Sequence, residues 1–92
     1  MSKKAVAEVT IINEKGLHAR AASQFTKVAS QYECKVVVRS GSVRANGKSI
    51  MNLLLLAAAQ GTTLTIEVHG SGASRCLSEL TELVSARFGE EL

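Results

Sequence analysis

The hydrophobic residues of this chain switch between a spacing of two and a spacing of three or four, and this series of patterns constrains the fold most. Alternating or β-branched segments predict strands over 5–12, 35–39, 42–45 and 63–69. Helical spacing predicts helices over 19–32, 50–59 and 73–88. The predicted order is therefore β-α-β-β-α-β-α. Its simplest packing is an α+β two-layer open-faced sandwich, in which three helices cover one face of a four-stranded antiparallel sheet.

The length and composition fit one compact domain. The chain has 92 residues, of which 46% are hydrophobic, so it can build a core but is too short for two domains. It contains no proline and no change of composition that would mark a linker, and we expect a single domain over 1–92. Aromatic residues make up 3% of the chain, so Val, Leu, Ile and Ala must form the core. The polar end, 89–92, is expected to be frayed.

Charge, hydropathy and cysteine spacing argue against several functions. The net charge is +3 and the basic residues are scattered, which is too weak a signal for nucleic-acid binding. The first residues lack the apolar run of a signal peptide and 53–59 is too short to span a bilayer, so we expect a soluble, cytoplasmic protein. Cys34 and Cys76 show no metal-ligand spacing with His18 or His69, which predicts buried, reduced thiols and neither metal nor cofactor. We expect His69, which has no adjacent Arg or Lys, to be a surface histidine.

The segment KGLHARAAS contains the candidate functional residue. His18 falls between a break at Gly16 and a helical pattern that begins at Ala19, which predicts a position at a helix N-terminus. The unpaired N–H groups and the dipole of such a terminus favour an anion, and Arg20 can donate to phosphate oxygens. A neutral imidazole is also a nucleophile that can carry a phosphoryl group. Local spacing leaves open the alternative that His18 is a capping or surface histidine without a functional role.

Two separate motifs resemble those of a known family. The segment GLHAR, residues 16–20, resembles the active-site motif of the HPr family, the histidine-containing phosphocarriers of the bacterial phosphoenolpyruvate-dependent phosphotransferase system. The segment NGKSIM, residues 46–51, resembles the second motif of that family, which carries a regulatory serine. The length and the predicted order of elements match as well. The resemblance covers essentially the whole chain.

The resemblance implies a role for each matched residue. His18 matches the histidine that Enzyme I phosphorylates on Nδ1 and that passes the group to an Enzyme IIA-type acceptor. Arg20 matches the arginine that steadies the phosphoryl group, and Gly16 and Ala19 belong to the same phosphate-binding motif. Ser49 matches the serine that HPr kinase/phosphorylase modifies in bacteria that have this enzyme. A protein of this kind is a stoichiometric phosphocarrier and not an enzyme.

The second motif also implies a surface for partners. Ile50, Met51 and Leu54 match apolar positions of the surface on which the family docks its partners. The helix predicted over 50–59 is apolar almost all round, which favours an exposed patch, although Leu54 can instead belong to the core. Ser49 is placed to cap this helix. A carrier that must present its histidine to several partners is expected to be a monomer that binds neither nucleic acid nor membrane.

One departure from the family pattern is Ala21, where sugar-type members usually have proline. Alanine is a good helix former, so the motif is expected to remain intact. The departure favours the nitrogen-related branch, in which the protein would be a regulatory module with phosphorylation-dependent partner binding. A ligand- or RNA-binding domain with an incidental histidine is a further alternative, but it calls for a concentrated basic face that the sequence lacks. A hydrolase is weaker still, because no carboxylate or hydroxyl neighbours His18 in sequence, which leaves open a partner that the fold brings close.

Overall fold

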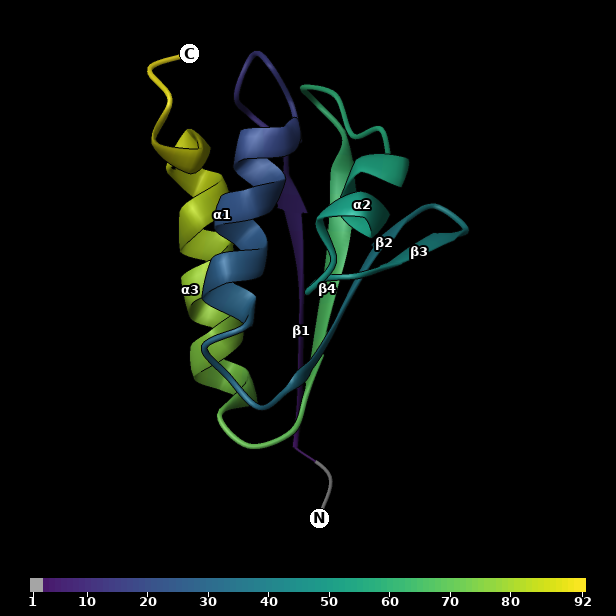
Figure 1. Ribbon diagram of the computed structural model, residues 1–92, viewed down its shortest axis with the longest axis vertical. Helices are drawn as coiled ribbons and strands as arrows, with labels where there is room; N and C mark the ends of the chain where they lie inside the picture. Colours follow the sequence, from purple (N-terminus) through teal and green to yellow (C-terminus); the bar gives the residue numbers. More distant parts are fainter. Residues whose placement is uncertain (1–2) are drawn as a thin grey trace.

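The computed structural model describes residues 3–92 (Figure 1). The strands are β1 (Lys4–Thr10), β2 (Lys35–Ser40), β3 (Val43–Asn46) and β4 (Thr63–His69). The helices are α1 (Ala19–Ala29), α2 (Ile50–Leu55) and α3 (Ala73–Ser85), and a short 3-10 turn, η1 (Arg87–Gly89), follows α3. The predicted β-α-β-β-α-β-α order is confirmed.

The strands form one antiparallel sheet in the order β1-β4-β2-β3. Its two faces differ as the alternation in the sequence predicts: Leu64, Ile66 and Val68 of β4 are buried, whereas Thr65 and Glu67 between them are partly exposed. Figure 1 shows the three helices gathered on one side of the sheet. The open-faced α+β sandwich is therefore confirmed. No helix in residues 3–92 is long and apolar enough to cross a membrane.

The core lies between the helices and the covered face of the sheet, and aliphatic side chains dominate it. Its largest fully buried apolar side chains are Ile11, Leu53, Leu64, Ile66, Leu80, Val36, Val38, Val68 and Val84. Phe25 and Phe88 are the aromatic side chains buried among them. The composition predicts such a core, because a chain with so few aromatic residues can bury little else.

All three helices end earlier than predicted, beginning with α1 and α2. The pattern predicts α1 up to Tyr32, but the helix ends at Ala29, and the N–H of Tyr32 bonds the carbonyl of Ala29 in a tight turn (3.3 Å). Tyr32 still packs against the core, so its place in the apolar pattern reflects burial and not helix. The pattern predicts α2 up to Ala59, but Ala57 has a left-handed φ of 49°, which ends the helix.

The last helix and the strands also differ from the prediction at their ends. The helical pattern continues to Phe88, but α3 ends at Ser85, because the backbone of Arg87 and Phe88 has positive φ. Phe88 reaches the core through this turn instead of through a helix. The strand predicted over 5–12 ends at Thr10 as β1. The other strand ends agree with the prediction or shift by one residue, and both ends of β4 agree.

Candidate functional site

The candidate site lies where the loop after β1 enters α1. Gly16 has a φ of +69°, and a Cβ atom at this position would lie 2.6 Å from the carbonyl oxygen of Ala58. Glycine is therefore required both by the conformation and by the space. Leu17 is buried and its N–H donates to the same Ala58 carbonyl (2.8 Å), so the loop is anchored just before His18. His18 is the N-cap residue of α1, and its predicted position at a helix N-terminus is confirmed.

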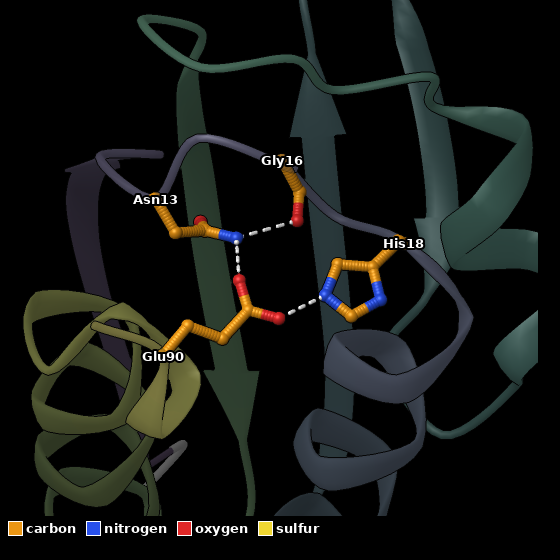
Figure 2. A network of polar contacts seen from close by, with 4 residues as sticks. All are labelled: Asn13, Gly16, His18 and Glu90. Atoms are coloured by element: carbon orange, nitrogen blue, oxygen red, sulfur yellow. Dashed lines mark hydrogen bonds and ion pairs between the residues drawn. The ribbon is translucent and has the colours of Figure 1, made fainter. Parts of the chain in front are cut away.

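His18 meets a carboxylate from the far end of the chain. Its Nε2 pairs with Oε2 of Glu90, 72 positions later in the sequence (Figure 2). The two side chains are 27% and 20% exposed, so water reaches both only in part. An ionised carboxylate only accepts hydrogen bonds, and the pairing therefore places the proton of the neutral imidazole on Nε2. The lone pair then belongs to Nδ1, which faces away from Glu90 in Figure 2.

Asn13 holds this carboxylate in place. Its side chain is fully buried, and Nδ2 donates to Oε1 of Glu90 and to the carbonyl oxygen of Gly16, both at 2.8 Å. One amide group thus joins the end of the chain to the loop that carries His18. The hydrogen bond from Asn13 is the main cause that lowers the pKa of Glu90 below its ordinary value of 4.5; burial opposes the shift and His18 adds to it. Glu90 is therefore ionised at neutral pH.

The first turn of α1 offers donors to an anion. Its leading N–H groups, which include that of Ala19, have no acceptor inside the helix, and the His18 side chain does not cap them. The first turn carries no acidic residue. Arg20 is exposed, and its guanidinium forms no ion pair within residues 3–92. A nucleophilic nitrogen, free N–H groups and an unpaired arginine therefore occur together at one helix end, where the dipole favours negative charge.

A sharp turn after α3 brings Glu90 to His18. Three consecutive residues have positive φ: Arg87 (57°), Phe88 (53°) and Gly89 (80°). Left-handed backbone is unfavourable for Arg and Phe, and it persists here because the side chain of Phe88 is buried in the core. Glu90 directly follows this turn, and its side chain reaches His18.

The expectation that 89–92 is frayed is wrong. The Glu90 side chain accepts a hydrogen bond from Asn13, and the carbonyl of Leu92 accepts one from the N–H of Glu14. The sequence reasoning therefore missed both Asn13 and Glu90. The available signal was Phe88, a large apolar residue close to a polar end, which indicates a segment that packs. Local spacing in the sequence does not indicate that Asn13 and Glu90, which lie so far apart in the chain, come together in the fold.

The second predicted motif begins α2 in the predicted way. The Oγ atom of Ser49 accepts a hydrogen bond from the N–H of Asn52 (3.2 Å), so the N-cap prediction is confirmed. The adjoining loop is also fixed: the N–H of Lys48 donates to Oδ1 of Asn46 (2.9 Å). Ser49 is half-buried, and its hydroxyl lies at the surface as a cap and not in the core.

The surface of α2 is apolar. Met51 and Leu55 are each 77% exposed, and Ile50 and Leu54 are exposed by about two fifths. We name these four residues the α2 patch. Leu53, between them, is fully buried in the core. The predicted exposure of Ile50, Met51 and Leu54 is confirmed, the alternative that Leu54 is a core residue is wrong, and Leu55 is an additional member.

The remaining candidate ligands are His69, Cys34 and Cys76. His69 is partly exposed at the end of β4, with its Nε2 3.8 Å from Oε1 of Glu67, in line with the predicted surface position. Cys34 and Cys76 are buried free thiols, also as predicted. Within residues 3–92 no three His, Cys, Asp or Glu side chains are grouped so that they could hold a metal ion.

Known proteins resemble this chain over most of its length. The family model described as "PTS HPr component phosphorylation site" matches residues 5–86. The chain is 46% identical over 82 residues to phosphocarrier protein HPr of Neisseria meningitidis, which covers 89% of this chain and 92% of that protein. It is also 36% identical over 83 residues to phosphocarrier protein NPr of Shewanella violacea, with 90% and 91% covered.

A solved structure agrees with these sequence relatives. HPr-C-His from Thermoanaerobacter tengcongensis matches with a TM-score of 0.92 and 32% identity, covering 96% of this chain and 99% of that one. The fold and the site thus define an open-faced sandwich of the phosphocarrier class, with its histidine at the start of the first helix. The chain belongs to the HPr family of the phosphotransferase system. The resemblance of segments 16–20 and 46–51 is confirmed at the level of the family.

Proposed function

We propose that this protein accepts a phosphoryl group on Nδ1 of His18 from phosphorylated Enzyme I and passes it to an Enzyme IIA-type acceptor. The observation that carries the proposal is the pairing of Nε2 with Glu90, which leaves Nδ1 as the nucleophilic nitrogen. In the transfer, the lone pair of Nδ1 forms a P–N bond while the donor's bond to phosphorus breaks. The group later leaves by the reverse displacement to the acceptor. The protein is then a stoichiometric carrier that works as one HPr-like domain, and not an enzyme.

The neighbouring groups suit the charges of the phosphorylated state. When Nδ1 is phosphorylated and Nε2 keeps its proton, the imidazole ring becomes cationic, and the carboxylate of Glu90 balances this charge. The phosphoryl oxygens would be held by the free N–H groups of the first turn, including that of Ala19, and by Arg20. Gly16 lets the loop approach closely enough to keep His18 at this position.

The α2 patch is our proposed docking surface for Enzyme I and the Enzyme IIA-type acceptor. Exposed apolar side chains that lie together commonly mark a protein interface. The first helix and α2 pack against each other, so a partner seated on the patch can also reach the start of α1. A monomer would leave both surfaces open, and we propose this state.

Ser49 is our proposed regulatory position, with HPr kinase/phosphorylase as the modifying enzyme where one is present. A phosphate on its hydroxyl would add close to two negative charges at the edge of the α2 patch. The N-terminus of α2 tolerates negative charge, so the modification would change docking more than folding.

A second candidate is a regulatory module of the nitrogen-related branch, which acts through phosphorylation-dependent partner binding. The observation in its favour is Ala21, which is fully buried in the first turn of α1 where sugar-type members usually have proline. Comparing the rates of phosphorylation by a sugar-type and a nitrogen-type Enzyme I would separate the two candidates.

The proposal is tested by mass measurement after incubation with phosphoenolpyruvate and Enzyme I. We expect one added phosphoryl group that acid treatment removes, because phosphohistidine is acid-labile. His18→Ala should gain no mass, whereas His69→Ala, a matched control at the exposed end of β4, should be phosphorylated as the wild type is. No added mass on the wild type, with an Enzyme I that phosphorylates another HPr, would refute the proposal.

A further inference from the structure

The face of the sheet that the helices leave uncovered gathers basic side chains from β2 and β3. On β2, Lys35 alternates with Val36 and so faces away from the helix layer. On β3, Arg44 lies directly opposite Arg39 of β2, and Asn46 lies opposite Val37. The antiparallel pairing of the two strands brings these side chains to one surface.

A pocket of about 410 Å³ opens at this place. Lys35, Arg44, Lys48 and Asn46 line it, with Val37 among its apolar lining residues. No carboxylate is among the lining residues. Pockets that bind small molecules have volumes from about 300 Å³ upward and combine an apolar lining with a few placed polar groups, so the size and the lining are suitable.

Among the described residues, the cations of the pocket form no ion pair with an acidic side chain. Glu67, on the adjacent strand β4, is held by Arg39 at 2.6 Å and by Lys4 at 3.7 Å. Lys35 and Arg44 form no ion pair within the described residues. The ammonium of Lys48 donates to the carbonyl of Tyr32 (2.6 Å), which fixes its position and leaves its charge in place.

We propose that this pocket binds a phosphorylated small molecule that carries two or more anionic charges. Arg44 can hold a phosphate group through two parallel hydrogen bonds, and Lys35 and Lys48 supply further charge around it. The pocket shares no residue with the His18 site, so the ligand is not the phosphoryl group in transit.

The surroundings favour a small ligand over an extended polyanion. Beyond the pocket the open face carries Glu67 on β4 and the exposed Glu8 on β1. A nucleic acid laid across the sheet would meet both carboxylates. A molecule confined to the pocket would have no carboxylate among its lining residues, and Glu67, opposite Val37, is already paired with Arg39. A hydrogen bond also links the pocket to α2, because the N–H of Asn46 donates to Oδ1 of Asn52 (3.3 Å). Binding of a ligand in the pocket should therefore affect the start of that helix.

The test is an amide NMR titration of the intact protein with inorganic pyrophosphate at constant ionic strength. We expect saturable shifts at 35–37 and 44–48, and weaker binding of inorganic phosphate. Arg44→Ala and Lys35→Ala, at exposed positions, should each weaken pyrophosphate binding by about fivefold, in line with the loss of one charged contact. Arg75→Ala, which removes the same charge from α3, should leave it unchanged.

Three results would overturn the proposal: shifts that do not saturate, shifts confined to the first turn of α1, or an equal loss in Arg75→Ala. The second result would mean that the anion prefers the His18 site. Because His18→Ala leaves this pocket intact, the titration can be repeated in that variant, where the shifts at 44–48 should persist. This separates failure of the pocket from failure of the phosphocarrier function.

Discussion

The reactivity of His18 depends on which of its ring nitrogens is free. Glu90 occupies Nε2, and Asn13 fixes Glu90 through a hydrogen bond to its other carboxylate oxygen. The ring is thus held in one orientation and one tautomer before any partner arrives. A histidine that was free to rotate would present either ring nitrogen to the phosphoryl donor. Only some encounters with the donor would then find Nδ1 in the orientation that the transfer needs.

We predict that Glu90→Gln slows phosphorylation of His18 by about tenfold, because hydrogen bonds to charged groups contribute roughly 1.5–3 kcal/mol and glutamine cannot balance the cationic ring. The measurement is a single-turnover reaction with phosphorylated Enzyme I. Glu91→Gln, which removes the neighbouring charge, is the control and should react at the wild-type rate. Equal rates for the wild type and Glu90→Gln would mean that the carboxylate has no part in the transfer.

The same substitution should also change the dependence of stability on pH. The pKa of Glu90 lies below its ordinary value of 4.5 in the folded protein, chiefly because Asn13 donates to the carboxylate. A lowered folded pKa stabilises the fold above the unfolded value, and this contribution disappears as the pH falls through the folded value. Denaturant unfolding should show the wild type more stable than Glu90→Gln at pH 7, with the difference narrowing below about pH 4.5. A difference that does not change with pH would contradict this origin.

Single residues of the site were predictable where their role is local. Gly16, His18 and Arg20 stand within five positions, and the break before a helical pattern was enough to place them. Asn13 and Glu90 are far apart in the sequence, and they come together because of the turn at Phe88. The left-handed backbone of Phe88 does not follow from the conformational propensity of this residue type.

At the scale of elements, α2 matters most for the proposed docking of partners, because it carries the α2 patch. We predict that Met51→Ala and Leu55→Ala each raise the KM for Enzyme I by about tenfold, because burying such a side chain in an interface contributes roughly 1.5 kcal/mol. Their exposure implies little change in the free energy of unfolding. Val43→Ala removes an exposed apolar side chain from β3 and is the control. An unchanged KM in the Met51→Ala, Leu55→Ala double variant would place docking elsewhere.

The N-terminus of α2 allows a test of regulation. We predict that Ser49→Asp lowers kcat/KM with Enzyme I about tenfold, since a negative charge enters the edge of the α2 patch, while the fold is retained because aspartate is a good N-cap residue. Ser74→Asp places the same charge in the first turn of α3 and should have no effect. Unchanged transfer in Ser49→Asp would argue against control at this serine.

The type of each element was predictable and its end often was not. Alternation and helical spacing indicate which side chains are buried, and the structure agrees with this burial pattern. The end of α2 is set by Ala57 and by the hydrogen bond between Leu17 and the carbonyl of Ala58, which is a tertiary contact. Likewise Tyr32 and Phe88 belong to the apolar pattern because they are buried, although neither is in an α-helix.

At the scale of the whole molecule, the sheet separates two surfaces of different character. The helix layer carries His18, the α2 patch and the bonded C-terminal segment, whereas the open face carries the basic pocket of β2 and β3. The sequence shows the basic residues as scattered, and only the antiparallel pairing of β2 with β3 gathers them. Under the proposed function, the molecule would exchange phosphoryl groups on one surface while the other remains accessible.

The most direct test of the account is the identity of the phosphorylated nitrogen. Long-range proton–nitrogen NMR of the histidine-labelled protein reports the state of both ring nitrogens of His18, before and after phosphorylation by Enzyme I. We predict a proton on Nε2 in the unmodified protein and, after transfer, phosphorus on Nδ1 with the Nε2 proton retained beside Glu90. Phosphorus on Nε2, or a proton on Nδ1 in the unmodified neutral ring, would contradict the role that we assign to Glu90.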